Sequence, residues 1–162
     1  MPHLKYLGAY PPALQQRVQQ MIDERALGDY LQRKYPETHS VQSDRALYLY
    51  CTDLKQTYLR VAPAIDKVVY DSKLDVVRHA LGLHTAISRV QGGKLKAKKE
   101  IRIASVFKEA PPEFLRMIVV HELAHLKEHD HNKAFYRLCE FMQPGYQQIE
   151  FDLRVFLTHR EL

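Results

Sequence analysis

Four of the chain's nine histidines lie within eleven positions, in the segment VVHELAHLKEHDHNKAFY (residues 119–136). His121 and His125 are four residues apart, so on an α-helix they share one face and lie about 6 Å apart along the axis. Two imidazoles in this arrangement can bind one metal ion. Glu122 is rotated by about 100° from His121, where its carboxylate can take a proton from a metal-bound water. This is the HExxH arrangement of zinc-dependent hydrolases.

A catalytic zinc ion needs a third protein ligand, which leaves the fourth position for a water whose pKa falls to about 7. His129 shares the helical face, but an unbroken helix would place it about 12 Å from His121 along the axis, too far to share one ion. His131 is the preferred third ligand, because a helix that ends soon after His125 lets the segment KEHDHN turn back. We therefore expect one zinc ion per chain, with Glu122 as the catalytic base.

The spacing of six residues between His125 and His131 also occurs in the pattern HExxHxxGxxH. Glu128 stands where that pattern has glycine, so the turn must have a different geometry. Glu140 or Glu150 is the alternative third ligand, as a carboxylate, and His129 is the least favoured.

The helix that must carry these residues begins after Pro111 and Pro112, because proline is tolerated in the first helical turn and Glu113 complements the positive end of the helix dipole. The segment EFLRMIVVHELAHL has almost no polar face, which predicts a central, buried helix. Burying two imidazoles and a carboxylate without compensation would cost several kcal/mol. The apolar surroundings therefore favour metal binding over a chance match to the motif.

Other helices are predicted on both sides of this one. Apolar residues recur at helical spacing from Pro12 to about Lys34, where Gly28 ends or bends the helix. A second helix follows a cap at Ser43 or Asp44 and continues until Pro63 stops it. Two more are expected, from near Asn132 and from Tyr146 to Leu157, separated by Pro144 and Gly145.

The strands are predicted between residues 65 and 105. KVVY is typical of a short strand, and KLDVVRHAL, closed by Gly82, of a short helix. HTAISRV and KEIRIAS alternate in side-chain character and flank QGG, whose glycines can adopt positive φ. These features predict a β-hairpin just before the buried helix.

Length and composition favour one globular domain, because the chain has 162 residues, of which 46% are hydrophobic and 27% charged. The first twenty residues contain no signal-peptide core and no stretch approaches a membrane span, so we expect a cytoplasmic protein without membrane contact. Cys51 and Cys139 lack a paired spacing, which predicts reduced thiols. The net charge of +5 favours anionic partners.

Three segments, MIVVHELAHLKEHDHNKAFY, LGLHTAISRVQGGKLKAKKEIRIASVF and TDLKQTYLRVAPAIDKVVYD, resemble the YgjP-like group of metal-dependent hydrolases, within a minigluzincin-like and SprT-like zincin neighbourhood. The resemblance covers essentially the whole chain. It implies a zincin-type α+β fold with His121, His125 and His131 on zinc and Glu122 as base. The wider family often has an Arg-Trp-Gly-Ser element before the zinc helix, whereas this chain has no Trp and carries SRVQGG there.

The predicted architecture is therefore α+β: a single zincin-like domain in which a small antiparallel hairpin or sheet packs on a central HExxH helix with flanking helices. Residues 1–63 form its helical N-terminal part. Residues 65–162 supply the hairpin and the metal-binding helices.

Basic residues gather around the hairpin, and four of them are candidate substrate ligands: Arg89, Lys94, Lys96 and Lys98. Lys99 and Arg102 add to this positive charge. Such a cluster can hold a phosphate or an acidic peptide, although a solvated face is the alternative.

Three functions compete. The first and preferred one is a metalloprotease-like peptidase that binds a peptide, with Glu122 activating water on zinc. The second is a phosphoanhydride hydrolase, a nucleoside triphosphate pyrophosphatase, in which zinc and the lysines neutralise phosphate charge. The third and weakest is a nucleic-acid-associated module with a structural metal, because structural zinc sites usually have four protein ligands, often cysteines. The sequence does not indicate an oligomeric state.

Overall fold

The computed structural model describes residues 2–74, 88–91 and 94–162, with side chains from Leu4 to Leu74 and from Lys99 to Leu162. The chain forms two compact units. The first comprises Met1–Glu37 and Gln147–Leu162, and the second comprises Thr38–Tyr146, which includes the histidine segment. The predicted single domain stays a prediction.

The first unit contains η1 (Pro2–Leu7), α1 (Pro12–Asp23), α2 (Leu27–Lys34) and nearly all of α6 (Tyr146–Arg160). One long helix was expected over residues 12–34, but the chain breaks at Arg25, whose φ is +55°. The Arg25 N–H donates to the Ile22 carbonyl at 3.0 Å and the Ala26 N–H to the Met21 carbonyl at 2.8 Å. This pair of bonds is a Schellman motif, which ends α1.

Gly28, expected to end or bend the helix, lies inside α2 instead. A Cβ atom at this position would lie 3.1 Å from the Cε1 atom of His159 on α6. The glycine therefore permits a close approach to a neighbouring side chain. It does not end α1, which the Schellman motif at Arg25 already ends.

Arg25→Gly is expected to stabilise the protein by about 0.5–1 kcal/mol, because the left-handed conformation costs a residue with a Cβ atom about 1–2 kcal/mol and glycine much less. The matched control is Arg17→Gly, at an exposed position in the middle of α1. That change should destabilise by about 1 kcal/mol, since glycine is a poor helix former. Urea denaturation measures both, and destabilisation by both variants would contradict the assigned helix end.

A buried carboxylate holds α2 and α6 together in the first unit. The Asp152 side chain is fully buried and accepts hydrogen bonds from the Tyr30 hydroxyl at 2.7 Å and from the Tyr35 hydroxyl. Lys34 lies 2.8 Å from the same carboxylate and neutralises it. A buried charge needs such partners, so this network is a structural cross-link.

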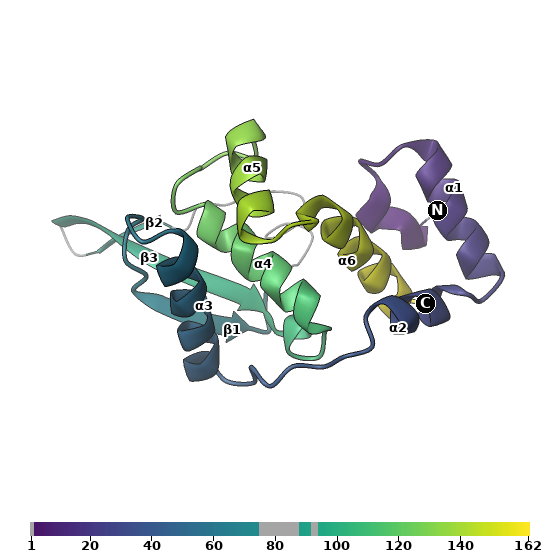
Figure 1. Ribbon diagram of the computed structural model, residues 1–162, viewed down its shortest axis with the longest axis horizontal. Coiled ribbons are helices and arrows are strands. Elements are labelled where there is room, and N and C mark those ends of the chain that lie inside the picture. The colour runs from purple at the N-terminus through teal and green to yellow at the C-terminus, as the bar shows by residue number, and fades with distance from the viewer. Residues whose placement is uncertain (1, 75–87, 92–93) are drawn as a thin grey trace. The chain divides into compact units, whose positions relative to one another are not determined.

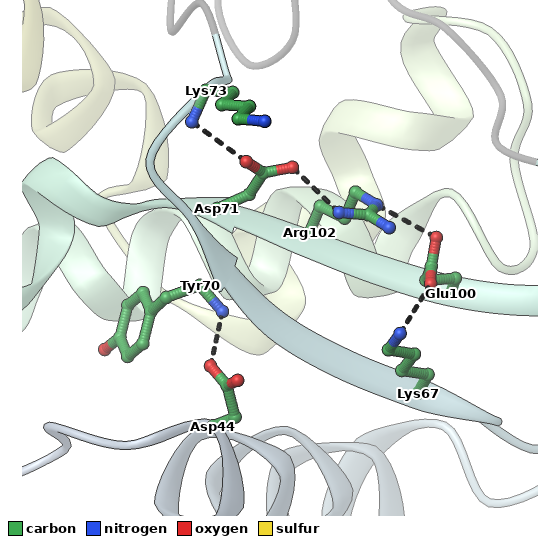
Figure 2. Close-up of polar contacts among 7 residues, drawn as sticks. All are labelled: Asp44, Lys67, Tyr70, Asp71, Lys73, Glu100 and Arg102. Atoms are coloured by element: carbon green, nitrogen blue, oxygen red, sulfur yellow. Dashed lines mark hydrogen bonds and ion pairs between the residues drawn. The ribbon is translucent and has the colours of Figure 1, made fainter.

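The second unit begins with α3 (Asp44–Tyr58) and a three-stranded sheet formed by β1 (Lys67–Asp71), β2 (Ser88–Gln91) and β3 (Lys94–Ala104). The Ser43 hydroxyl caps α3 by accepting from the Ala46 N–H at 3.0 Å. Asp44, the other predicted cap, accepts from the Tyr70 N–H of β1 at 2.8 Å, as Figure 2 shows. The two adjacent residues therefore have different roles.

The strand order is β1-β3-β2. β2 and β3 pair antiparallel, which confirms the predicted hairpin. β1 pairs with β3 in parallel, so the sheet is not purely antiparallel. A parallel pair needs a crossover of a dozen or more residues, and the chain between Asp71 and Lys94 is long enough to supply it. Apart from Lys73 and Leu74, which are not helical, the helix predicted for KLDVVRHAL lies outside the described residues. So does the QGG turn, apart from Gln91.

Ion pairs connect β1 and β3 on the sheet face opposite the buried Ile101 and Ile103 (Figure 2). Arg102 on β3 lies 2.8 Å from Asp71 on β1 and 2.9 Å from Glu100 on its own strand. Because Arg102 is ion-paired with two carboxylates, its positive charge is compensated. This argues against a contribution of Arg102 to an anion-binding surface around the hairpin.

The sheet leads through η3 (Ser105–Lys108) into α4 (Pro112–Ala124), and α5 (Lys133–Met142) follows. Figure 1 shows α3 and α4 against the sheet, with the β2–β3 hairpin reaching beyond them. α4 is buried nearly all round, as predicted: nine of its thirteen residues are buried, namely Phe114, Leu115, Met117, Ile118, Val119, Val120, His121, Leu123 and Ala124. Within the described parts of the chain, no helix is both long enough and apolar enough to cross a membrane.

Candidate metal centre

The end of α4 places the first two histidines. His121 lies in its last turn and is only 2% exposed, while His125 is the C-cap, with φ −67° and ψ −13°. Beyond it, the Leu126 N–H donates to the Leu123 carbonyl at 3.0 Å and the Glu128 N–H to the Ala124 carbonyl at 2.9 Å. The helix therefore ends at His125, as ligation by His131 requires.

A short connection then brings the chain back to α5. Among the described residues, Arg25 is the only one other than glycine with a positive φ. Glu128, which stands where the pattern HExxHxxGxxH has glycine, therefore does not adopt a left-handed conformation. Asn132 caps α5 with its side chain, which accepts from the Phe135 N–H at 2.9 Å. This cap starts α5 directly after His131 and so anchors that residue.

The three imidazoles converge through their Nε2 atoms. The Nε2 atom of His125 lies 3.3 Å from that of His121 and 3.1 Å from that of His131. Ligand nitrogens at about 2.0–2.1 Å from a tetrahedral zinc ion are about 3.3–3.4 Å apart. These three histidines also form the one group of metal-ligating side chains found in the described residues, with ligand atoms within 4.8 Å of one another. The donor set therefore fits a metal ion.

The remaining ring nitrogens of two histidines have buried or backbone partners. The Nδ1 atom of His125 donates to the Glu128 carbonyl at 2.9 Å, and a carbonyl can only accept. In the neutral ring its Nε2 atom therefore carries the lone pair that a metal needs. The Nδ1 atom of His121 lies 2.9 Å from the hydroxyl of Tyr146, which is fully buried. Such partners orient metal-ligating histidines.

Phe135 of α5 lies against all three imidazoles. Its ring stacks on His125 at a centroid distance of 4.5 Å and lies 5.0 Å from His121 and 4.9 Å from His131. Burial lowers the pKa of His131, although Asp130 acts in the opposite direction. The lowered pKa favours the neutral imidazole at pH 7, which is the form that binds metal.

The family model for YgjP-like metallopeptidase domains matches residues 19–155. The chain belongs to the YgjP-like family. A curated protein of Escherichia coli (strain K12), named UTP pyrophosphatase, is 59% identical over 162 residues, which cover 100% of this chain and 97% of that protein. No solved structure gave a significant match.

The YgjP-like chain is thus a member of a metal-dependent hydrolase family with a three-histidine group, as the sequence predicted. Glu122 is half-buried on α4 next to His121. Its negative charge adds to the effect of burial in raising the pKa of the Cys51 thiol on α3 to about 12. Cys51 therefore stays protonated. Both cysteines are buried, and within the described part of the chain neither forms a disulfide.

The other candidate ligands of this YgjP-like chain lie in different settings. His129 is exposed and is not part of the three-histidine group. Glu140 accepts from the Gly145 N–H at 2.9 Å and so holds the turn before α6. Glu150 lies in the first unit, 3.9 Å from Arg154. None of these carboxylates joins the group found in the described residues.

The candidate substrate residues of the hairpin are placed by backbone alone. Arg89 on β2 and Lys98 on β3 are Cα partners, and Lys94 is the partner of Gln91. The side chains of these residues and of Lys96 lie outside the described part of the chain. Their role in substrate binding therefore stays a prediction.

The sequence did not predict two hydrogen-bond partners of the histidine group. These are Tyr146, which contacts His121, and the Glu128 carbonyl, which contacts His125. Tyr146 opens α6, twenty-five positions after His121, and nothing in its local pattern indicates a contact with an imidazole. Phe135 lies in the helix that was expected to begin near Asn132, but its contact with all three imidazoles was not predicted.

Proposed function

We propose that the chain is a metal-dependent phosphoanhydride hydrolase that acts on a nucleoside triphosphate, with UTP as the first substrate to test. The observation that carries the proposal is the 59% identity, over the whole chain, to a protein named UTP pyrophosphatase. The three-histidine group and Glu122 are the side chains of this chain that would supply the chemistry. The sequence alone ranked the peptidase first, and the name of this relative supports the second candidate instead.

In this proposal His121, His125 and His131 hold one zinc ion per chain, and Glu122 is the general base. When bound, zinc would supply Lewis-acid stabilisation of the negative charge that develops on phosphate oxygen. Glu122 takes a proton from the attacking water, whose oxygen bonds to the α-phosphorus as the bond between the α- and β-phosphates breaks. The products are the nucleoside monophosphate and pyrophosphate. The half-buried position of Glu122 keeps the carboxylate accessible to water.

The hairpin supplies the proposed contacts to the triphosphate through Arg89, Lys94, Lys96 and Lys98. The pairing of Arg89 with Lys98 places two basic residues side by side across the hairpin backbone. Cationic side chains favour a phosphate ligand over a neutral peptide. We propose a nucleotide as the partner and the cytoplasm as the location, with nucleic acid the least supported partner.

Replacing Lys94, Lys96 and Lys98 together with alanine is expected to raise KM for UTP about tenfold or more, because each lost contact is worth about 0.5–1 kcal/mol. Added salt should weaken wild-type binding, since these contacts are electrostatic. Steady-state kinetics at two salt concentrations measures both effects. The control Lys5→Ala, at an exposed position in the first unit, should leave KM unchanged. An unchanged KM in the triple variant would show that the lysines do not bind substrate and only form a solvated face.

A peptidase is the second candidate, because the matched family model is described as a metallopeptidase domain. The deciding experiment incubates purified wild type and Glu122→Gln with UTP and, separately, with an unfolded protein. Nucleotide products are separated by chromatography and peptides by electrophoresis. We expect Glu122-dependent hydrolysis of UTP and no cleavage of the protein. Glu122-dependent cleavage of the protein, with UTP intact, would establish the peptidase instead.

A further inference from the structure

Tyr146 contacts one of the proposed metal ligands, and neither the motif nor the comparisons assign it a role. It is fully buried, and its hydroxyl lies 2.9 Å from the Nδ1 atom of His121. The opposite ring nitrogen, Nε2, faces His125 at 3.3 Å. The two nitrogens of the His121 imidazole therefore face different groups: Nδ1 faces Tyr146, and Nε2 faces the proposed metal position.

We propose that Tyr146 is a positioning residue for metal binding: it selects the tautomer of His121 that carries its proton on Nδ1 and leaves Nε2 free for the ion. The inference rests on the proposed three-histidine zinc site. In the neutral ring only one nitrogen carries a proton, so a hydrogen bond donated from Nδ1 to the tyrosine oxygen leaves the lone pair on Nε2.

The surroundings make this bond important for His121 in particular. His125 obtains the same tautomer from a backbone carbonyl, which no side-chain substitution removes. His121 is 2% exposed, so water is poorly placed to replace the tyrosine as acceptor. Without the Tyr146 oxygen, the hydrogen bond between that oxygen and the Nδ1–H group would be lost in a buried site, and the other tautomer, which presents N–H toward the metal position, would gain population.

The experiment compares Tyr146→Phe, which deletes one oxygen atom and keeps the ring, with Tyr70→Phe as the matched control. Tyr70→Phe also removes one part-buried hydroxyl hydrogen bond, to the Val41 carbonyl at 2.7 Å, and Val41 is not one of the proposed metal ligands. Zinc affinity is measured on full-length protein by competition with a chromophoric chelator. Thermal unfolding of the metal-free proteins records the loss of stability separately.

We expect Tyr146→Phe to weaken zinc binding by about 10–100-fold, as for other partners of metal-ligating histidines, and Tyr70→Phe to change it less than twofold. Similar losses of metal-free stability in the two variants would show that the difference in affinity is not a general folding effect. Zinc affinity of Tyr146→Phe within twofold of wild type would overturn the inference.

His121→Ala separates this inference from the proposed function. If that variant loses zinc while Tyr146→Phe keeps full affinity, only the positioning role fails. If His121→Ala binds zinc as tightly as wild type, the three-histidine site fails, and the role of Tyr146 fails with it.

Nitrogen-15 NMR of the zinc-loaded wild type tests the same inference without any variant. Both His121 and His125 should carry a slowly exchanging proton on Nδ1. In Tyr146→Phe the His121 proton should exchange faster, whereas the His125 proton, held by the Glu128 carbonyl, should persist. A wild-type His121 that lacks a proton on Nδ1 would overturn the proposal even if Tyr146→Phe failed to fold.

Discussion

Glu122→Gln is expected to keep the full zinc content and to lower hydrolysis by about 10²–10⁴-fold, the usual contribution of general acid–base catalysis. The amide keeps the size and shape of the carboxylate but cannot accept a proton at neutral pH. Glu122 is not part of the group of side chains whose ligand atoms converge, so metal binding should not depend on its carboxylate. Metal analysis and single-turnover hydrolysis of UTP measure the two effects on the same preparation.

The matched control for this change is Glu109→Gln. Glu109 is exposed in the segment between η3 and α4, so loss of its charge should leave turnover unchanged. Full activity of Glu122→Gln with zinc retained would end the general-base assignment. Loss of zinc from Glu122→Gln would instead show that the carboxylate supports the ion.

His131→Ala is expected to weaken zinc binding by more than about 100-fold, because partners that only orient a metal ligand already contribute 10–100-fold. Its Nε2 atom lies 3.1 Å from that of His125, and the neutral imidazole is favoured by burial. Zinc content after dialysis against a chelator measures the loss. Two histidines and water would then have to hold the ion.

His129→Ala is the control, because His129 comes from the same connection and is exposed. It should keep the zinc content of wild type. If His131→Ala retained zinc, the third ligand would have to come from elsewhere, and Glu140→Gln and Glu150→Gln would be the next variants to compare. Loss of zinc from His129→Ala alone would contradict the observed arrangement of the connection.

Predictions based on local pattern agreed best with the structure. The proline start of α4, the Ser43 cap of α3 and the Asn132 start of α5 depend on neighbouring residues in the chain, so the sequence contains all the required information. The pairing of His121 with His125 is equally local, because helical geometry places positions four apart on one face.

Predictions that depend on distant segments needed the structure. The parallel pairing of β1 with β3 could not be predicted from the alternation of polar and apolar residues, because this pattern indicates a strand but not its partner. Arg102 was counted in the basic hairpin, yet Asp71 from another strand neutralises it. The end of the first long helix was also predicted at the wrong residue. Glycine is the usual residue at a helix end, so Gly28 was chosen, whereas Arg25 adopts the left-handed conformation.

The sequence by itself predicted a buried helix with two metal-ligating histidines, and it ranked His131 first as third ligand. Only the tertiary structure brought His131, and not the other candidates, into one group with His121 and His125 among the described residues, because the helix ends at His125. Only the tertiary structure brought the Tyr146 hydroxyl to His121. The physical reason is that one helix sets the spacing of its own side chains, whereas contacts between helices depend on how the chain packs between them.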